Sequence, residues 1–88
     1  MSKFRKKPVI IDAVRWNGDN FAEIAKLGDN IFGPYGQENA HLEIKTLEGR
    51  MTADLGDWVI RGVKGECYPC KNDIFLLTYE ATKDEQKS

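Results

Sequence analysis

The chain has 88 residues, of which 41% are hydrophobic and 31% charged, and its formal net charge is −1. A chain of this size forms one small domain, with room for a single core and little space for a deep pocket. The sequence shows no catalytic triad, Walker loop, dinucleotide fingerprint or multi-ligand metal cluster. Its apolar runs are far shorter than the roughly 18 residues that a membrane-spanning helix needs.

Charge divides unevenly along the chain. A basic N-terminal arm, residues 1–7, carries +4 from Lys3, Arg5, Lys6 and Lys7. Residues 8–80, which we expect to form one globular domain, carry seven basic and twelve acidic side chains, which gives −5. Residues 81–88 lack a large apolar side chain and are expected to be a flexible tail. The apolar stretch after the arm is too short for a signal peptide, so we expect a cytoplasmic location.

The first half of the chain predicts a strand, a short helix and a loop. Residues 8–16 are rich in β-branched and aromatic side chains that alternate from Ile10 onward, which favours a strand. Asn20, followed by Glu23, is a loose match to the reciprocal N-terminal capping pattern, and Gly28 is a natural helix end. Residues 29–40 lose all periodicity and contain two glycines and a proline, so they predict a mobile loop.

The second half predicts two hairpins and a final strand. Residues 41–46 and 50–53 alternate around a glycine turn, and residues 58–61 and 66–69 flank a second tight turn. Residues 71–75 are ambiguous and fit a single helical turn, whereas residues 76–80 predict a last strand. The expected fold is therefore α+β: a small, mostly antiparallel five- or six-stranded sheet or partial barrel with one short helix.

Large apolar and aromatic side chains in these elements define the expected core. Most of the nine aromatic residues must be buried in so small a domain. The predicted core residues are Ile10, Val14, Trp16, Phe21, Ile24, Ile44, Trp58, Val59, Ile60, Phe75 and Leu77.

Several short motifs resemble those of a family of small proteins encoded by tailed bacteriophages and prophages. The motifs are Gly-Asp-Trp at 56–58, Gly-x-x-Gly-Glu at 62–66 and Thr-Tyr-Glu at 78–80, with an opening Lys-Phe-Arg-Lys-Lys-Pro-Val at 3–9. The resemblance covers both ends of the domain and leaves residues 30–40 outside it. It implies an origin in a phage genome and a site of action in the cytoplasm of a bacterial host, but it assigns no catalytic residue.

Two cysteines three residues apart form the most distinctive local motif. Cys67 and Cys70 have the spacing of a redox pair or of two zinc ligands. However, they lie in an expected strand rather than at a helix N-terminus, and His41 is the chain's single histidine. Two reduced cysteines, one facing the core, are the simpler interpretation. We expect no metal and no cofactor.

Acidic residues gather in the stretch with the strongest resemblance, where Asp57, Glu66 and Asp73 lie with Asp54. Paired carboxylates can serve as acid and base in catalysis. Turn chemistry explains them better, because a short Asp side chain accepts backbone hydrogen bonds at a turn. For Glu66 we expect a cross-strand ion pair with Lys64 or Arg61. No catalytic residue is predicted.

A non-enzymatic phage accessory protein that binds a host or phage protein is the leading hypothesis. Phe32, Pro34 and Tyr35, in the predicted loop, are the expected partner-binding residues, together with an exposed sheet edge. A homodimer through such an edge is an open alternative. A second hypothesis is nucleic-acid binding through Lys3, Arg5, Lys6 and Lys7, with an aromatic side chain stacked on bases. The third is the thiol-redox or zinc protein described above.

Overall fold

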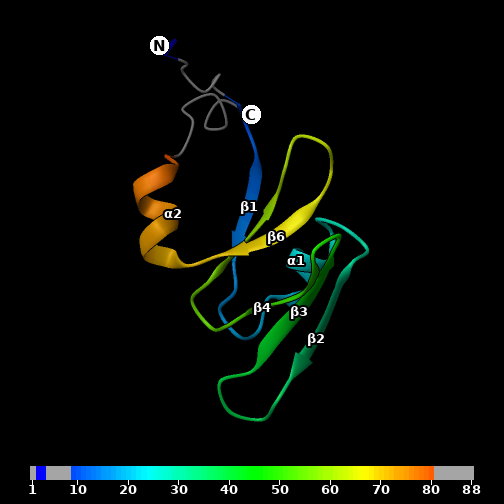
Figure 1. Cartoon of the computed structure of the whole chain (residues 1–88). Helices are drawn as coiled ribbons and strands as arrows, with labels where there is room; N and C mark the ends of the chain where they lie inside the picture. The colour runs from blue at the N-terminus through cyan, green and yellow to red at the C-terminus, as the bar shows by residue number, and fades with distance from the viewer. Residues whose placement is uncertain (1, 4–8, 81–88) are drawn as a thin grey trace.

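The computed structural model describes residues 2–3 and 9–80 and contains two small antiparallel sheets and two short helices. Sheet A has the strand order β1-β5-β6, and sheet B has the order β2-β3-β4. Figure 1 shows α2 beside sheet A and α1 behind the strands, while the β2–β3 loop forms the lower end of the molecule. The α+β class and the antiparallel pairing are confirmed, whereas the six strands form two sheets rather than one.

Sheet A joins the two ends of the domain. Its strands are β1 (Asp12–Arg15), β5 (Trp58–Arg61) and β6 (Cys67–Cys70), and β5 lies in the middle. The Trp16 N–H donates to the Asp57 carbonyl (2.8 Å), and the Gly56 N–H donates to the Trp16 carbonyl (2.8 Å). The ladder between β1 and β5 therefore continues one residue beyond the strands.

Sheet B contains the hairpin that the alternating pattern predicts. Strands β3 (His41–Thr46) and β4 (Gly49–Ala53) pair in a continuous register, and Gly49 has the positive φ of 121° that the tight connection requires. Strand β2 (Ile31–Tyr35) pairs with the other edge of β3.

The predicted loop over residues 29–40 is wrong because β2 lies within it. Ile31 is 6% exposed and faces the core. Its burial stabilises a strand that the local sequence alone does not favour. The register shifts between Phe32 and Tyr35, and Pro34 lies in this shifted stretch. An edge strand tolerates such a residue, because a proline there removes no hydrogen bond from a central ladder.

The core lies between the two sheets and is closed by α1 (Phe21–Ala25). Trp16 is fully buried, and its Nε1 donates to the Ala40 carbonyl at 2.8 Å. The other buried members of this cluster are Ile24, Leu27, Ile31, Leu42, Ile44, Ala53, Val59 and Cys67. Trp16, Ile24, Ile44, Val59 and Ile60 are buried as predicted, and Val14 and Phe21 pack against the core while partly buried.

The capping pattern predicted for α1 forms only in part. Asn20 is the N-cap residue, but its side chain caps no helical N–H. Its Nδ2 donates to the Arg15 carbonyl (2.8 Å) and its Oδ1 accepts the Asn17 N–H (3.1 Å), so it ties the turn to the end of β1.

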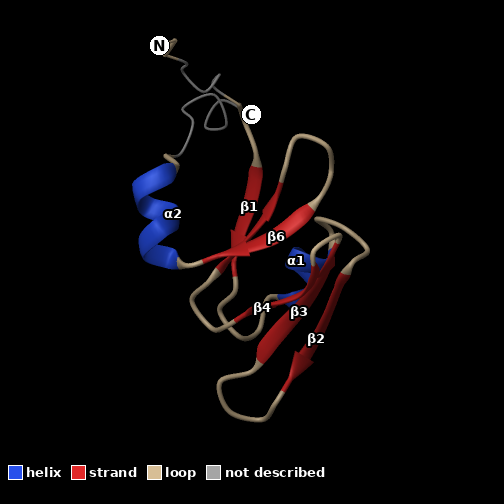
Figure 2. Ribbon diagram, in the orientation of Figure 1, coloured by secondary structure: helices blue, strands red, loops and turns tan. Residues whose placement is uncertain are grey.

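A helix replaces the predicted last strand over residues 76–80. Helix α2 (Asn72–Thr78) packs on the face of sheet A that points away from sheet B, as Figure 2 shows. Phe75 stacks on Trp58 with ring centroids 4.0 Å apart, and the Trp58 Nε1 donates to Asn72 Oδ1 at 2.9 Å. These residues form a second, half-buried aromatic cluster rather than part of the main core.

Two residues predicted to lie in the core are on the surface. Leu77 is 88% exposed, because the helix turns it away from the sheet that an alternating strand would have faced. Ile10 is 67% exposed, because it precedes β1 and lies beyond the ladder with β5.

Candidate protein-interaction surface

The predicted partner-binding residues lie on the outer face and free edge of sheet B. Phe32 is opposite Glu43 and Tyr35 is opposite His41 in the β2–β3 register. Phe32 is 41% exposed and Tyr35 is 45% exposed, and Pro34 between them is exposed as well. We call these three residues the β2 patch. The strand thus presents two aromatic side chains to solvent, although the sequence predicted them on a loop.

Charged side chains border the β2 patch on the same face. The Glu43 carboxylate lies 3.0 Å from Arg50 Nη1 and 3.6 Å from His41 Nε2. Together with Lys45, Glu43 and Arg50 join Phe32 and Tyr35 in lining a shallow hollow of about 200 Å³. The surface therefore combines apolar contact area with charges of both signs.

The residues of the nucleic-acid hypothesis fall mostly outside the described part of the chain. Lys3 is described and exposed, whereas Arg5, Lys6 and Lys7 lie outside the described residues. On the outer face of sheet B, Lys45 is exposed beside the two aromatic residues, but Arg50 is already paired with Glu43.

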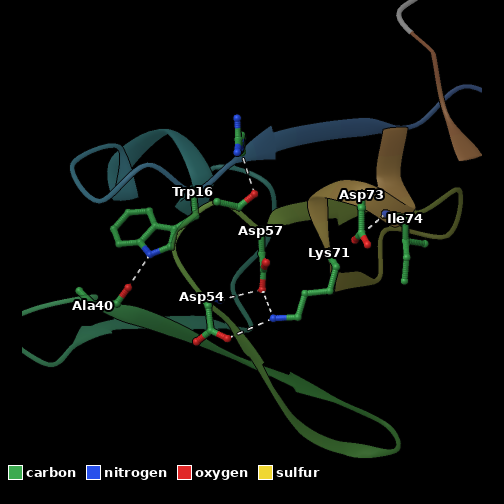
Figure 3. Close-up of polar contacts among 9 residues, drawn as sticks. Trp16, Ala40, Asp54, Asp57, Lys71, Asp73 and Ile74 are labelled. Atoms are coloured by element: carbon green, nitrogen blue, oxygen red, sulfur yellow. Dashed lines mark hydrogen bonds and ion pairs between the residues drawn. The ribbon is translucent and has the colours of Figure 1, made fainter. Parts of the chain in front are cut away.

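Asp57 is the buried carboxylate of the described chain, and it holds a turn (Figure 3). Its Oδ2 accepts the Asp54 N–H at 2.9 Å and Lys71 Nζ at 2.9 Å. Lys71 Nζ also reaches Asp54 Oδ2 at 3.1 Å. These hydrogen bonds to Asp57 and Asp54 raise the pKa of the Lys71 ammonium. The cluster fastens the loop before β5 to the residue that precedes α2.

The other two carboxylates cap separate pieces of backbone. Asp73 Oδ1 accepts the N–H of Ile74 at 2.9 Å in the first turn of α2. Glu66 Oε1 accepts the Lys64 N–H at 3.0 Å across the tight turn between β5 and β6. The predicted ion pair of Glu66 with Lys64 or Arg61 is not recorded among the described residues, because the carboxylate turns inward to this backbone. Turn chemistry therefore accounts for all three acids.

The two cysteines occupy opposite ends of β6. Cys67 pairs with Arg61 and Cys70 pairs with Trp58, so an extended strand separates them by about 10 Å. A disulfide needs Cα atoms roughly 4.4–6.8 Å apart, so these two cannot form one in this fold. Cys67 is 2% exposed, its Sγ donates weakly to the Leu27 carbonyl, and burial raises its pKa. The geometry gives no support to a thiol-redox or two-cysteine zinc function.

An open hollow of about 610 Å³ lies where the β3–β4 hairpin meets β6. Leu47, Met51, Cys67 and Tyr68 supply much of its lining. Burial, followed by a hydrogen bond with Tyr79, raises the pKa of Tyr68 to about 12, so its hydroxyl stays protonated at neutral pH. Cys67 and Glu66 both line it, but the Cys67 thiol donates to the Leu27 carbonyl and the Glu66 carboxylate accepts the Lys64 N–H, so the two do not form a nucleophile–base pair and we assign the hollow no chemistry.

A third hollow escaped the sequence analysis. It has a volume of about 330 Å³ and is lined by Val9, Ile10, Ile11, Ala13, Trp58, Phe75, Leu76, Tyr79 and Glu80. We call it the α2 groove. Phe75 and Tyr79 are four residues apart, so in a helix their side chains lie on the same side. This spacing could have predicted a helix with both rings on sheet A and Leu76 beside the groove.

Within the described residues, no group of three His, Cys, Asp or Glu side chains is placed to hold a metal ion. Neither described helix has the length and apolar character to cross a membrane. No protein-family model matches this sequence, and no curated protein or solved structure matches it significantly.

Proposed function

We propose that this chain is a non-enzymatic accessory protein of a tailed bacteriophage or prophage, and that it binds a host or phage protein through the β2 patch. The observation that carries the proposal is the exposed pair Phe32 and Tyr35 on the edge strand of sheet B. Aromatic side chains are enriched at protein interfaces because they supply large, rigid contact area. A free strand edge beside them offers backbone groups to the same partner.

Affinity capture from a bacterial host lysate, with the wild-type chain and a Phe32→Ala/Tyr35→Ala variant compared, tests the proposal. Truncating one aromatic anchor of this kind costs about 2 kcal/mol, or about thirtyfold in affinity, so the double variant should bind the captured partner about thirtyfold to a thousandfold more weakly. Leu47→Ala is the matched control, since Leu47 is fully exposed at the tip of the β3–β4 hairpin. Equal affinity of the double variant and the wild type would contradict the proposal.

The phage origin rests on the motif resemblance and has an independent test. The reading frame should lie among replication, lysis or structural genes of a phage or prophage. Its position there would also distinguish host manipulation from virion assembly, because genes for each stage of infection cluster together.

Nucleic-acid binding is the second candidate, and one observation favours it. Lys45 lies on the same exposed face of sheet B as Phe32 and Tyr35, and aromatic side chains beside a cation suit single-stranded nucleic acid. This function predicts a gel shift at low salt that deletion of residues 1–7 weakens steeply. Retention of a protein partner at high salt, without any gel shift, would decide for protein binding.

A further inference from the structure

We propose that a second copy of this chain pairs with the free edge of β1 and fills the α2 groove, giving an antiparallel homodimer on the opposite side of the fold from the β2 patch. Sheet A ends at β1, because β1 pairs with β5 and with no other described strand. Unpaired strand edges are templates for association with another chain.

Among the described residues, no hydrogen-bond partner occupies the backbone groups of Ile11 and Ala13 that such pairing needs. Trp16 directs both its backbone N–H and its backbone C=O toward β5. Because this direction alternates along a strand, the backbone groups of the even-numbered residues of β1 point toward β5 as well. The odd-numbered residues, Ile11 and Ala13 among them, therefore direct theirs toward the open edge. The Arg15 carbonyl confirms the alternation, because Asn20 Nδ2 approaches it from that open side at 2.8 Å.

This hydrogen bond to Arg15 also selects the register. A two-fold axis at Ala13 would place Ile11 opposite Arg15 of the second copy, whose carbonyl already has a donor. A two-fold axis at Ile11 keeps the Arg15 carbonyl outside a ladder formed by residues 9–13 of each copy. It pairs Ile11 with Ile11 and Val9 with Ala13, and each of these pairs exchanges both hydrogen bonds. Within residues 9–13 of this register no two like charges are directly opposite, because Asp12 lies opposite Ile10. Beyond them Arg15 would be opposite Lys7, so we limit the proposed ladder to residues 9–13.

Shape complementarity supports the same register. Ala13 is opposite Ile60 in the β1–β5 ladder and lies under α2, where its small side chain leaves the groove open. Val9 of the second copy, opposite Ala13, would place its larger side chain in this space, next to Leu76 and Tyr79. The groove is thus filled by the same strand that forms the hydrogen bonds.

The apolar area available predicts a weak dimer. Val9, Ile10 and Leu76 are 47%, 67% and 63% exposed at the groove. Burying an aliphatic side chain removes roughly 100 Å² from water, so these residues and the edge backbone give an interface below the standard size of about 800 Å² per partner. We therefore expect association in the micromolar range.

Light scattering on the full chain tests the oligomeric state. At about 100 µM the wild type should approach twice the chain mass of 10.0 kDa and should dissociate on dilution. Val9→Asp and Leu76→Lys should each weaken association at least about tenfold while the far-UV circular dichroism stays unchanged. Leu47→Lys, on the exposed hairpin tip, is the control and should dimerise as the wild type does.

Cross-linking tests the register. Ile11→Cys in a Cys70→Ser background places two thiols across the proposed axis, where paired Cα atoms lie about 5.5 Å apart, within disulfide range. Oxidised glutathione should convert this variant to a covalent dimer, and the equivalent Leu47→Cys variant should remain monomeric. A wild type that stays monomeric at about 100 µM overturns the proposal. A dimer that persists in the Val9→Asp and Leu76→Lys variants also overturns it. The same holds if the full chain stays monomeric and dimerises only after residues 81–88 are deleted.

Discussion

Replacing Asp57 with alanine should destabilise the fold more than replacing any exposed acid. The Asp57 carboxylate accepts the Asp54 N–H, and the residue Asp57 is 6% exposed. Loss of a hydrogen bond to a charged acceptor costs about 1.5–3 kcal/mol, and the donor is left in the loop without its partner. We expect Asp57→Ala to lower the free energy of unfolding by about 2 kcal/mol, which corresponds to a fall of roughly 8–16 °C in Tm.

Three companion variants separate the contributions to this loss. Asp57→Asn keeps an oxygen for the Asp54 N–H and removes the charge opposite Lys71, so it should cost about 1 kcal/mol. Lys71→Met removes an exposed cation and should cost less than Asp57→Ala, since water screens much of its attraction. Asp54→Ala is the matched control, because its carboxylate is 59% exposed and its loss should change stability by less than about 0.5 kcal/mol.

Urea unfolding, followed by the fluorescence of Trp16 and Trp58, measures these differences. Trp16 lies in the main core and Trp58 at the contact between α2 and sheet A, so the summed fluorescence follows both regions. A transition that coincides with the one seen by far-UV circular dichroism would indicate two-state unfolding. If Asp57→Ala unfolds at the wild-type midpoint, the carboxylate does not hold the turn. A buried acid would then lack a structural role, and catalysis would have to be reconsidered.

Three further measurements test the second aromatic cluster and the buried polar groups. Phe75→Ala should cost about 2 kcal/mol, because the half-buried ring stacks on Trp58, and urea unfolding measures the loss. The folded state keeps the Tyr68 proton up to a pKa of about 12, whereas the unfolded chain releases it near the ordinary tyrosine pKa of 10.0. The free energy of unfolding should therefore fall as pH rises from 10 to 12, and Tyr68→Phe should flatten this slope in a pH series of urea titrations. Burial raises the pKa of Cys67, so its thiol should react with a disulfide reagent only on the unfolding timescale at pH 8, as a stopped-flow absorbance assay would show.

The strands of both hairpins could be predicted because their local pattern and their final environment agree. Leu42 and Ile44 alternate with polar neighbours, and the structure buries both on one face of sheet B. Gly49 marks the connection that requires a positive φ. Where one face of a strand is buried and the other solvated, periodicity alone identifies the element.

The α2 and β2 elements could not be predicted because tertiary contacts decide them. The short apolar run of α2 fits a helix and a strand equally well by its pattern. The contact that stabilises the helix is the stacking of Phe75 on Trp58, which is 17 positions away in the sequence. In β2 the Gly33-Pro34 pair has the composition of a turn, and the adjacent β3 edge nevertheless holds it in a strand. Propensity is a weak guide in both cases.

The exposure of two residues of the candidate surface could be predicted from the sequence, but the arrangement of their side chains could not. The sequence left Phe32 and Tyr35 without a core partner, and both side chains are exposed. Their position on a pleated edge, with Glu43 and Arg50 beside them, depends on the β2–β3 register, which the sequence analysis did not include. The α2 groove was missed for a related reason, since it exists only because residues 72–78 are helical.

The two proposed surfaces are compatible because they belong to different sheets. A dimer formed at β1 would use sheet A, and the β2 patch on sheet B would stay exposed in both copies. Two patches fixed to one rigid body bind a repetitive or dimeric partner with an effective concentration that can raise the avidity about 10²–10⁴-fold over a single patch. The homodimer would therefore compensate for the small area of the β2 patch. Val9→Asp, which should leave the patch intact, should then weaken capture of a multivalent partner while leaving the affinity for a monovalent one unchanged.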